Sequence, residues 1–210
     1  MKKIKIIATA VSVSLLSCFY LPATAQKEPL KLELNYNYSI PTGNFKKDMV
    51  SNGSPRGFMG SLMYPFSDKW SAGLSYGFQD YYQKYPRALY HLTNTQSISA
   101  VLSNSVQTTP ILIKAKYFPG TTSFLNPYVS VAAGANIIDY KQYYGEFGNI
   151  SQSNFGFRAE GGLGVVIPFK KTGTSGLNIG ATYDYAPYHK NNFKDLNSIN
   201  VQAGVEIQLR

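Results

Sequence analysis

Apolar and polar side chains alternate along most of the chain that follows residue 29. In LKLELNYNYSI, residues 30–40, the even positions carry Leu, Tyr or Ile, and the odd positions carry polar or charged side chains. A period of two over eleven residues is typical of a β-strand with two different faces and excludes a helix. The alternation recurs seven times, which predicts eight strands, at residues 30–40, 58–66, 70–78, 111–117, 129–137, 155–167, 177–185 and 199–209. No sustained helical period occurs after residue 25, so we expect an all-β fold.

The connections between these strands alternate in length. Those after the second, fourth and sixth strands are short (SDK, PGTTSFLN and KKTGTSG), whereas the others are longer and polar. The longest runs from about residue 84 to residue 104. Short turns at one end and long loops at the other are typical of an up-and-down barrel that crosses a membrane. The sequence therefore predicts an eight-stranded antiparallel transmembrane β-barrel, with both termini at the short-turn end.

Residue types along the strands favour a membrane barrel over a soluble one. Aromatic residues concentrate towards the strand ends, and aliphatic or small residues lie between them. This is the layout of two interfacial girdles around an apolar band. The alternative is a soluble barrel or sandwich whose apolar face points inward. In that case the opposite face would be rich in charge, whereas here it is largely Gly, Ser, Asn and Gln.

The first 25 residues have the features of a secretory signal peptide. Three lysines precede an apolar run from Ile6 to Leu21, and the small residues of ATA, residues 23–25, suit a signal peptidase. We predict cleavage after Ala25, which leaves residues 26–210 as an outer-membrane β-barrel domain without cysteine. The loss of three lysines lowers the formal charge from +9 to +6. An uncleaved anchor and a lipoprotein signal at Cys18 are the alternatives.

The chain closes on another alternating strand, VQAGVEIQLR, whose edge would be exposed unless it paired with the first strand. Polar Gln202 is followed by Gly204 and then by Ile207 and Leu209 on one face. In this spacing the chain resembles the bacterial outer-membrane protein β-barrel domain family, the small eight-stranded OmpA/OmpX-type barrels. The stretches PTGNF, NPYVSVAAGAN and NFGFRAEGGLG are also similar to that family, and the likeness extends from about Leu30 to the end.

The resemblance implies that Gln202, Gly204, Ile207 and Leu209 form an assembly signal, which the barrel-assembly machinery reads during insertion. This chain departs from the family pattern because its last apolar residue is Leu209 rather than an aromatic residue, and Arg210 follows it. The motifs mark architecture and imply no specific activity.

Charged residues on the polar face would point into the barrel. Four are basic and four are acidic: Lys31, Glu33, Lys114, Lys116, Arg158, Glu160, Asp184 and Glu206. A barrel of about eight strands has an interior just wide enough for side chains, and buried ions there must pair. We therefore predict a lumen plugged by a charge network, with Arg158 and Glu160 near the middle and most of the others near the short turns. The alternative is that Lys31 and Asp184 lie beyond the membrane and are hydrated.

Candidate catalytic chemistry is sparse. His91 and His189, both in predicted long loops, are the only histidines. A lipid-modifying enzyme would need one of them with a serine and a carboxylate. The candidates are His189 near Asp184 and His91 near several serines, and nothing in the sequence fixes a nucleophile beside either. Because the chain after residue 25 lacks cysteine and its histidines lie far apart, we expect no metal site and no cofactor.

The long loops carry a basic excess of +5, which suits the phosphates of lipopolysaccharide, although an ordinary solubilising surface is an equal alternative. The scattered Lys and Arg do not favour nucleic acid. Tyrosines near the rim are candidate membrane anchors or a contact surface: Tyr81, Tyr82, Tyr85, Tyr90, Tyr140, Tyr143, Tyr144 and Tyr188.

These features favour a monomeric, non-enzymatic protein of the bacterial outer membrane with a structural or surface-contact role. Binding or passage of a small ligand is the alternative, and a lipid-modifying enzyme is a third hypothesis.

Overall fold

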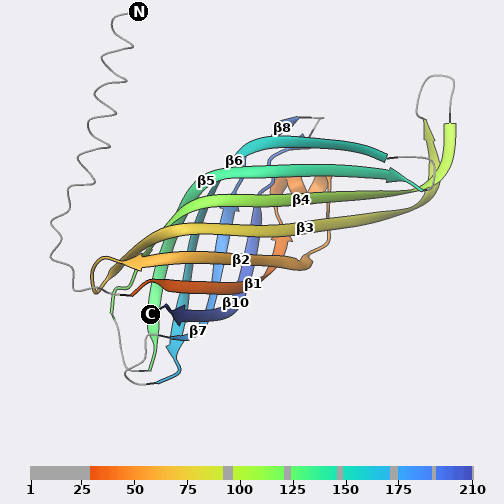
Figure 1. Cartoon of the computed structure of the whole chain (residues 1–210). Coiled ribbons are helices and arrows are strands. Elements are labelled where there is room, and N and C mark those ends of the chain that lie inside the picture. The colour runs from red at the N-terminus through yellow and green to blue at the C-terminus, as the bar shows by residue number, and fades with distance from the viewer. Residues whose placement is uncertain are drawn as a thin grey trace, which may run out of the picture.

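The strands of the protein close into a single antiparallel barrel (Figure 1). The computed structural model describes residues 29–91, 97–120, 124–145, 149–170, 175–190 and 193–209. The barrel strands are β1 (Lys31–Pro41), β2 (Ser54–Pro65), β3 (Trp70–His91), β4 (Ser97–Tyr117), β5 (Asn126–Tyr144), β6 (Asn149–Pro168), β7 (Gly176–Tyr185) and β10 (Ser198–Gln208). The expected eight-stranded all-β barrel is confirmed. The predicted signal peptide, residues 1–25, lies outside the described residues.

The last strand pairs with the first along its whole length. The register runs from Lys31 opposite Gln208 to Pro41 opposite Ser198. The Leu209 amide also donates a hydrogen bond of 2.7 Å to the Leu30 carbonyl. Closure therefore gives the terminal strand a partner and removes an edge that would otherwise invite aggregation.

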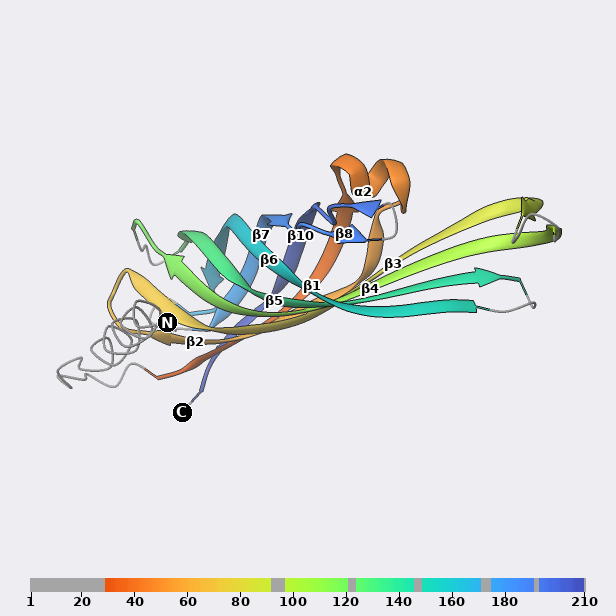
Figure 2. The same cartoon turned by 90° about the horizontal axis from the view of Figure 1, so that it is seen from above.

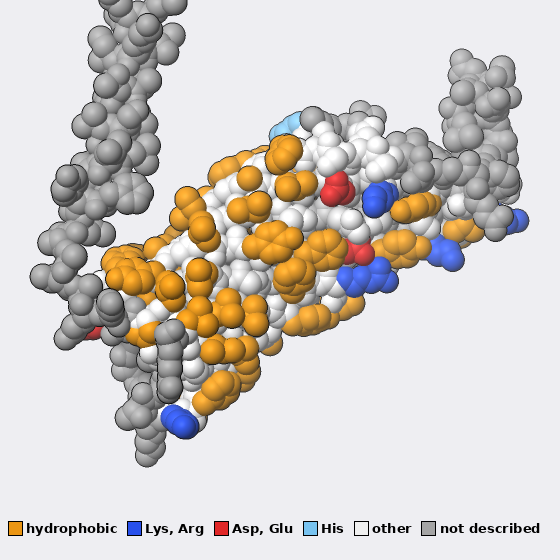
Figure 3. Space-filling view, viewed as in Figure 1, with side chains coloured by type: hydrophobic (Ala, Val, Ile, Leu, Met, Phe, Trp, Pro, Cys, Tyr) orange, Lys and Arg blue, Asp and Glu red, His pale blue; other side chains and the backbone are white. Residues whose placement is uncertain are grey.

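Alternation sets which side chains face outward. In β1 the burial pattern alternates strictly from Glu33 to Pro41, with the even, apolar positions exposed. Exposed apolar side chains on other strands, such as Leu74 and Ile113, which are 62% and 70% exposed, continue this band. Figure 3 shows apolar side chains over the face of the barrel that it draws. The inner face is correspondingly polar, with buried Asn, Ser and Gln side chains and several ions. The outward apolar face is the one that a membrane barrel requires.

The prediction of a long loop between residues 84 and 104 is wrong, because most of this segment is strand. β3 continues to His91 and β4 begins at Ser97, and they pair from Lys84 opposite Ser103 to His91 opposite Ser97 around an irregularity next to Arg87. β5 and β6 pair out to Tyr143 opposite Asn149. These four strands therefore project together well past the rest of the barrel (Figure 2). The alternation was hard to detect here because both faces of the projection carry polar residues.

Two short features lie at the long-loop end. A six-residue helix, α2 (Gly43–Asp48), follows β1, although the sequence predicted no helix. The short strands β8 (His189–Lys190) and β9 (Phe193–Lys194) form a separate hairpin. One turn and a half of helix is too short to produce a recognisable helical period. Within the described ranges, every helix is too short or too polar to cross a membrane.

Candidate functional site

Five charged side chains meet inside the barrel near the short turns, and we call them the lower charge cluster. Glu33 of β1 and Glu206 of β10 lie directly opposite each other across the closure. Lys116 lies 2.5 Å from Glu33 and 4.0 Å from Glu206. Lys114 lies 3.5 Å from Glu33, and Lys31 lies 2.9 Å from Glu206. Two carboxylates in this position would repel each other, and the three ammonium groups offset that repulsion.

A hollow lies on the short-turn side of this cluster. Its volume is 380 Å³, and its lining includes Glu33, Glu206, Asp68 and Trp70. Because both glutamates line it, the lower charge cluster forms part of its wall. The hollow is therefore a vestibule that leads from the short turns to the buried ions.

A tyrosine lies next to the lower charge cluster in the lumen. The ring of Tyr128 lies 4.1 Å from the Lys116 ammonium, and its hydroxyl donates a hydrogen bond of 2.8 Å to the side chain of Asn178. A Cβ atom at Gly164 or Gly180 would lie 2.6 Å or 2.8 Å from the Tyr128 hydroxyl. These glycines therefore make room for a large side chain that fills the lumen.

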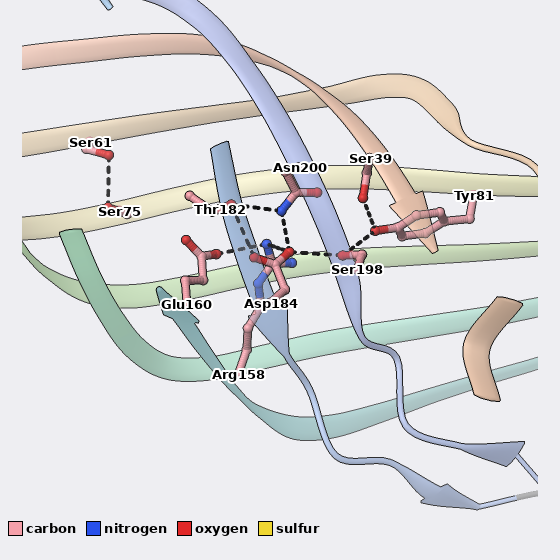
Figure 4. A network of polar contacts seen from close by, with 10 residues as sticks. All are labelled: Ser39, Ser61, Ser75, Tyr81, Arg158, Glu160, Thr182, Asp184, Ser198 and Asn200. Carbon is pink, nitrogen blue, oxygen red and sulfur yellow. Dashed lines mark hydrogen bonds and ion pairs between the residues drawn. The ribbon is translucent and has the colours of Figure 1, made fainter. Parts of the chain in front are cut away.

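A second group, the upper charge cluster, consists of Arg158, Glu160 and Asp184 (Figure 4). One guanidinium nitrogen of Arg158 lies 2.8 Å from Glu160 and 2.5 Å from Asp184. The two carboxylates come from residues that face each other across β6 and β7. Asp184 also accepts hydrogen bonds from the side chains of Asn200, at 2.5 Å, and Ser198, at 3.1 Å. The arrangement compensates a buried cation from several directions, as a buried ion requires.

An apolar cap covers the upper charge cluster on the long-loop side. Its link to the cluster is Tyr81, whose hydroxyl donates a hydrogen bond of 3.2 Å to Ser198 and is 2.5 Å from the Ser39 hydroxyl (Figure 4). The Phe45 ring of α2 packs edge-on against Tyr81 at 4.8 Å. Together they belong to a buried cluster of Phe45, Met49, Val50, Tyr81, Val106, Ile138, Tyr140, Ala186, Tyr188 and Leu196.

The outer membrane protein beta-barrel domain family matches residues 11–208 of the chain. The chain belongs to this family. The resemblance stated from the closing strand is thereby confirmed.

Among solved structures, the chain is similar to Neisserial surface protein A (NspA). NspA is 15% identical with a TM-score of 0.56, over 86% of this chain and 97% of that chain. The N-terminal barrel domain of Pseudomonas aeruginosa OprF is 17% identical with a TM-score of 0.42, over 84% of this chain and 97% of that chain. Yersinia pestis Ail, the attachment invasion locus protein, is 14% identical with a TM-score of 0.43, over 85% of this chain and 97% of that chain. A comparison with curated proteins gave no match. The likeness to NspA shows the fold alone.

For this member of the family, the structure places all eight predicted lumen charges on the inner face and joins them in the two clusters. The hydrated alternative is wrong for Asp184, whose side chain is 1% exposed within the upper charge cluster. Lys31 keeps a side-chain exposure of 20%, at the edge of the lower cluster. Sequence reasoning placed these residues by alternation but missed the cap. The signal for the cap was present in the spacing of Phe45, Met49 and Val50 after the first strand.

The four residues of the predicted assembly signal lie on β10 and just after it. Gln202 is buried in the lumen, and Ile207 and Leu209 are exposed on the outward face. A Cβ atom at Gly204 would lie 1.9 Å from the Leu34 carbonyl oxygen, so only glycine fits the close approach of β1. Their role as a signal to the assembly machinery stays a prediction.

The rim tyrosines do not share one role. Tyr81, Tyr140 and Tyr188 are buried in the apolar cap, so the prediction that they anchor the membrane or contact a partner is wrong for these three. Burial raises the pKa of the Tyr188 phenol. Tyr82 and Tyr143 are exposed. Tyr85 hydrogen-bonds the Met49 carbonyl at 3.1 Å, and the side chains of Tyr90 and Tyr144 lie outside the described residues.

His189 is not brought together with its candidate partner Asp184. His189 is exposed in β8, whereas the carboxylate of Asp184 points into the upper charge cluster. The side chain of His91 lies outside the described residues. Within the described ranges, no group of three or more His, Cys, Asp or Glu has a geometry that could hold a metal ion.

Proposed function

We propose that this protein is an integral component of the bacterial outer membrane whose lumen is plugged, and that its role is structural or in surface contact rather than enzymatic. Family membership and the outward apolar band support the membrane location. The observation that carries the plug is the pairing of eight interior ions in two clusters. An ion passing through would have to separate buried pairs, which is costly in a narrow, poorly hydrated interior.

Planar bilayer recordings of the purified full-length protein test the plug. We expect no steady, large conductance from the wild type or from Phe45→Ala, because this variant removes part of the cap and leaves both charge clusters in place. Stable channels of porin size from the wild type would overturn the proposal. Channels from Phe45→Ala alone would assign closure to the cap instead of the clusters.

The location needs its own measurement. We expect export with cleavage after Ala25, insertion by the barrel-assembly machinery and a monomeric barrel in contact with outer-membrane lipid and lipopolysaccharide. Fractionation of cells that express the protein should place it in the outer membrane, and mass spectrometry should find Gln26 at the N-terminus. Recovery in the soluble periplasm would refute the membrane assignment.

The vestibule supports a second candidate, the binding of a small ligand from the short-turn side. Its 380 Å³ and its mixture of carboxylates with Trp70 and other apolar walls are suited to a small molecule. Binding there should be lost when Trp70 is replaced by Ala and should be unchanged by substitutions in α2. The third hypothesis, a lipid-modifying enzyme, requires that replacement of His91 or His189 abolish a measurable lipid modification.

A further inference from the structure

A group of basic and aromatic side chains lies on the outward face of the projecting strands, just beyond the apolar band. We call it the outer basic patch: Arg56, Tyr82, Lys84, Arg87, Ser103 and Lys141. The strand register puts these residues on one face, since Tyr82 lies opposite Ser105 and Ser105 opposite Lys141. Arg87 lies opposite Val101 in the same way. Figure 3 shows basic side chains beyond the apolar band of the barrel.

Contacts within the patch hold Tyr82 at its centre. The Arg56 guanidinium lies 5.8 Å from the centroid of the Tyr82 ring, and the Tyr82 hydroxyl donates a hydrogen bond of 3.2 Å to Ser103. Arg56 also forms an exposed ion pair of 3.2 Å with Asp80. A planar cation and an aromatic ring on an ordered strand are a preformed surface for a ligand.

Three of the four cations of the patch form no ion pair with a carboxylate of the described residues. Among the described residues, no carboxylate lies within 4.0 Å of Lys84, Arg87 or Lys141. Asp80 and Asp139 share this face, so the four cations leave a net positive charge. The surplus charge lies on the outward face of the strands, beyond the end of the apolar band.

The distance of these residues from the hydrocarbon layer limits which lipid groups they can contact. Phe78, opposite Phe58, marks the end of the aromatic border on β3. Tyr82 and Lys84 follow four and six residues later. At about 3.3 Å per residue and a tilt of about 45°, they lie about 9 and 14 Å further from the hydrocarbon. Phospholipid phosphates form a single layer close to that border, whereas a glycolipid with phosphorylated sugars carries anions over this greater depth.

We infer that the outer basic patch binds the phosphorylated sugar headgroup of a glycolipid in the outer leaflet, the chemistry of lipopolysaccharide. This inference rests on the proposed outer-membrane location. Lys84 and Lys141 supply point charges to phosphates, Arg56 offers a planar donor, and Tyr82 presents a ring to a sugar. The patch sits on the outward face, so the bound lipid remains in the membrane beside the barrel.

Binding of defined lipids to the full-length protein in detergent tests the inference. The probes are lipid A with both phosphates, dephosphorylated lipid A, and phosphatidylglycerol, followed by native mass spectrometry. Wild type should prefer phosphorylated lipid A. Lys84→Gln/Lys141→Gln should weaken that binding by about 30-fold, since each cation near an anionic surface contributes about 1 kcal/mol.

The matched control is Lys46→Gln/Lys47→Gln, which removes the same charge from exposed positions on α2, away from the outward face. It should change binding by less than about threefold, because salt screens the interaction between exposed charges on α2 and a lipid bound at the patch. Equal losses in the two double variants, or equal binding of dephosphorylated lipid A, would overturn the inference. Equal preference for phosphatidylglycerol would reduce the patch to general attraction by charge and would also overturn it.

A second measurement covers the case in which the double variant does not fold. Bound lipid A should protect Lys84 and Lys141 of the wild type, but not Lys46 and Lys47, from acetylation by an added reagent. Uniform labelling would refute the contact. These assays use purified barrel, so a wrong cellular location would appear in fractionation and would leave the lipid preference measurable.

Discussion

Replacement of Arg158 is the most informative test of how much the buried ion pairs stabilise the barrel. Its side chain is 6% exposed and binds both Glu160 and Asp184. Arg158→Ala leaves two buried carboxylates without their cation, and the ion pair with Arg158 at 2.8 Å is the interaction that the structure gives Glu160 Oε1. Removal of one partner from a buried ion pair costs about 3–5 kcal/mol. We therefore expect the free energy of unfolding to fall by about that amount.

The chain contains a matched exposed pair. Arg56 binds Asp80 at 3.2 Å, but its side chain is 62% exposed, and exposed ion pairs contribute about 0–1 kcal/mol. Arg56→Ala should therefore have a small effect. Replacement of the whole upper cluster, Arg158→Met with Glu160→Gln and Asp184→Asn, should restore most of the stability, because it leaves no uncompensated charge.

Urea unfolding in lipid vesicles, followed by fluorescence, measures these differences. The chain has one tryptophan, Trp70, which is 45% exposed at the start of β3 and reports entry into the membrane border. Equal losses for Arg158→Ala and Arg56→Ala would refute the reasoning, since burial would then have no influence. Failure of the triple variant to recover would show that shape, rather than charge compensation, is what Arg158 contributes.

Three further changes test orientation, assembly and the cap. An epitope tag at Thr95 should be accessible on intact cells, and a tag at Asp68 should not be; the reverse labelling would invert the orientation. Leu209→Asp should reduce the folded barrel in the membrane severely, although an outward charge near an interface costs only about 0–1 kcal/mol; normal insertion would remove the role in assembly. Phe45→Ala, at a buried site, should cost the cap about 3–5 kcal/mol and speed proteolysis between residues 42 and 53, while the barrel itself stays resistant.

The strand order and the facing of side chains were predictable from the sequence because alternation has a strict physical cause. A strand buried on one side must carry apolar residues at every second position, so the pattern itself assigned Glu33 and Arg158 to the interior. The closing strand was predictable for the same reason. Pairing between particular ions was not, because it depends on the depth of each residue and on which strands face each other across the lumen.

The parts of the fold that the sequence did not predict are those in which apolar and polar surroundings do not alternate from one residue to the next. Between Lys84 and Ser103 water contacts much of both faces of the projection, so the alternation no longer separates polar from apolar residues. Phe45 is buried by a loop that folds back onto Tyr81, a contact between residues 36 positions apart. No local pattern reports such a contact, and only the apolar spacing after the first strand hinted at it.

The two charge clusters also bear on how the barrel closes. Glu33 faces Glu206 across β1 and β10, and Glu160 faces Asp184 across β6 and β7. Directly opposed like charges destabilise a strand pair, so neither pairing is favourable unless a cation bridges it. For the closure that cation is Lys116, which comes from β4, three strands away from β1 in the barrel order. A slip of one residue in β1 would turn Glu33 towards lipid and leave Lys116 without its closest partner. Closure in the correct register and filling of the lumen are therefore the same event, and the lower charge cluster makes each depend on the other.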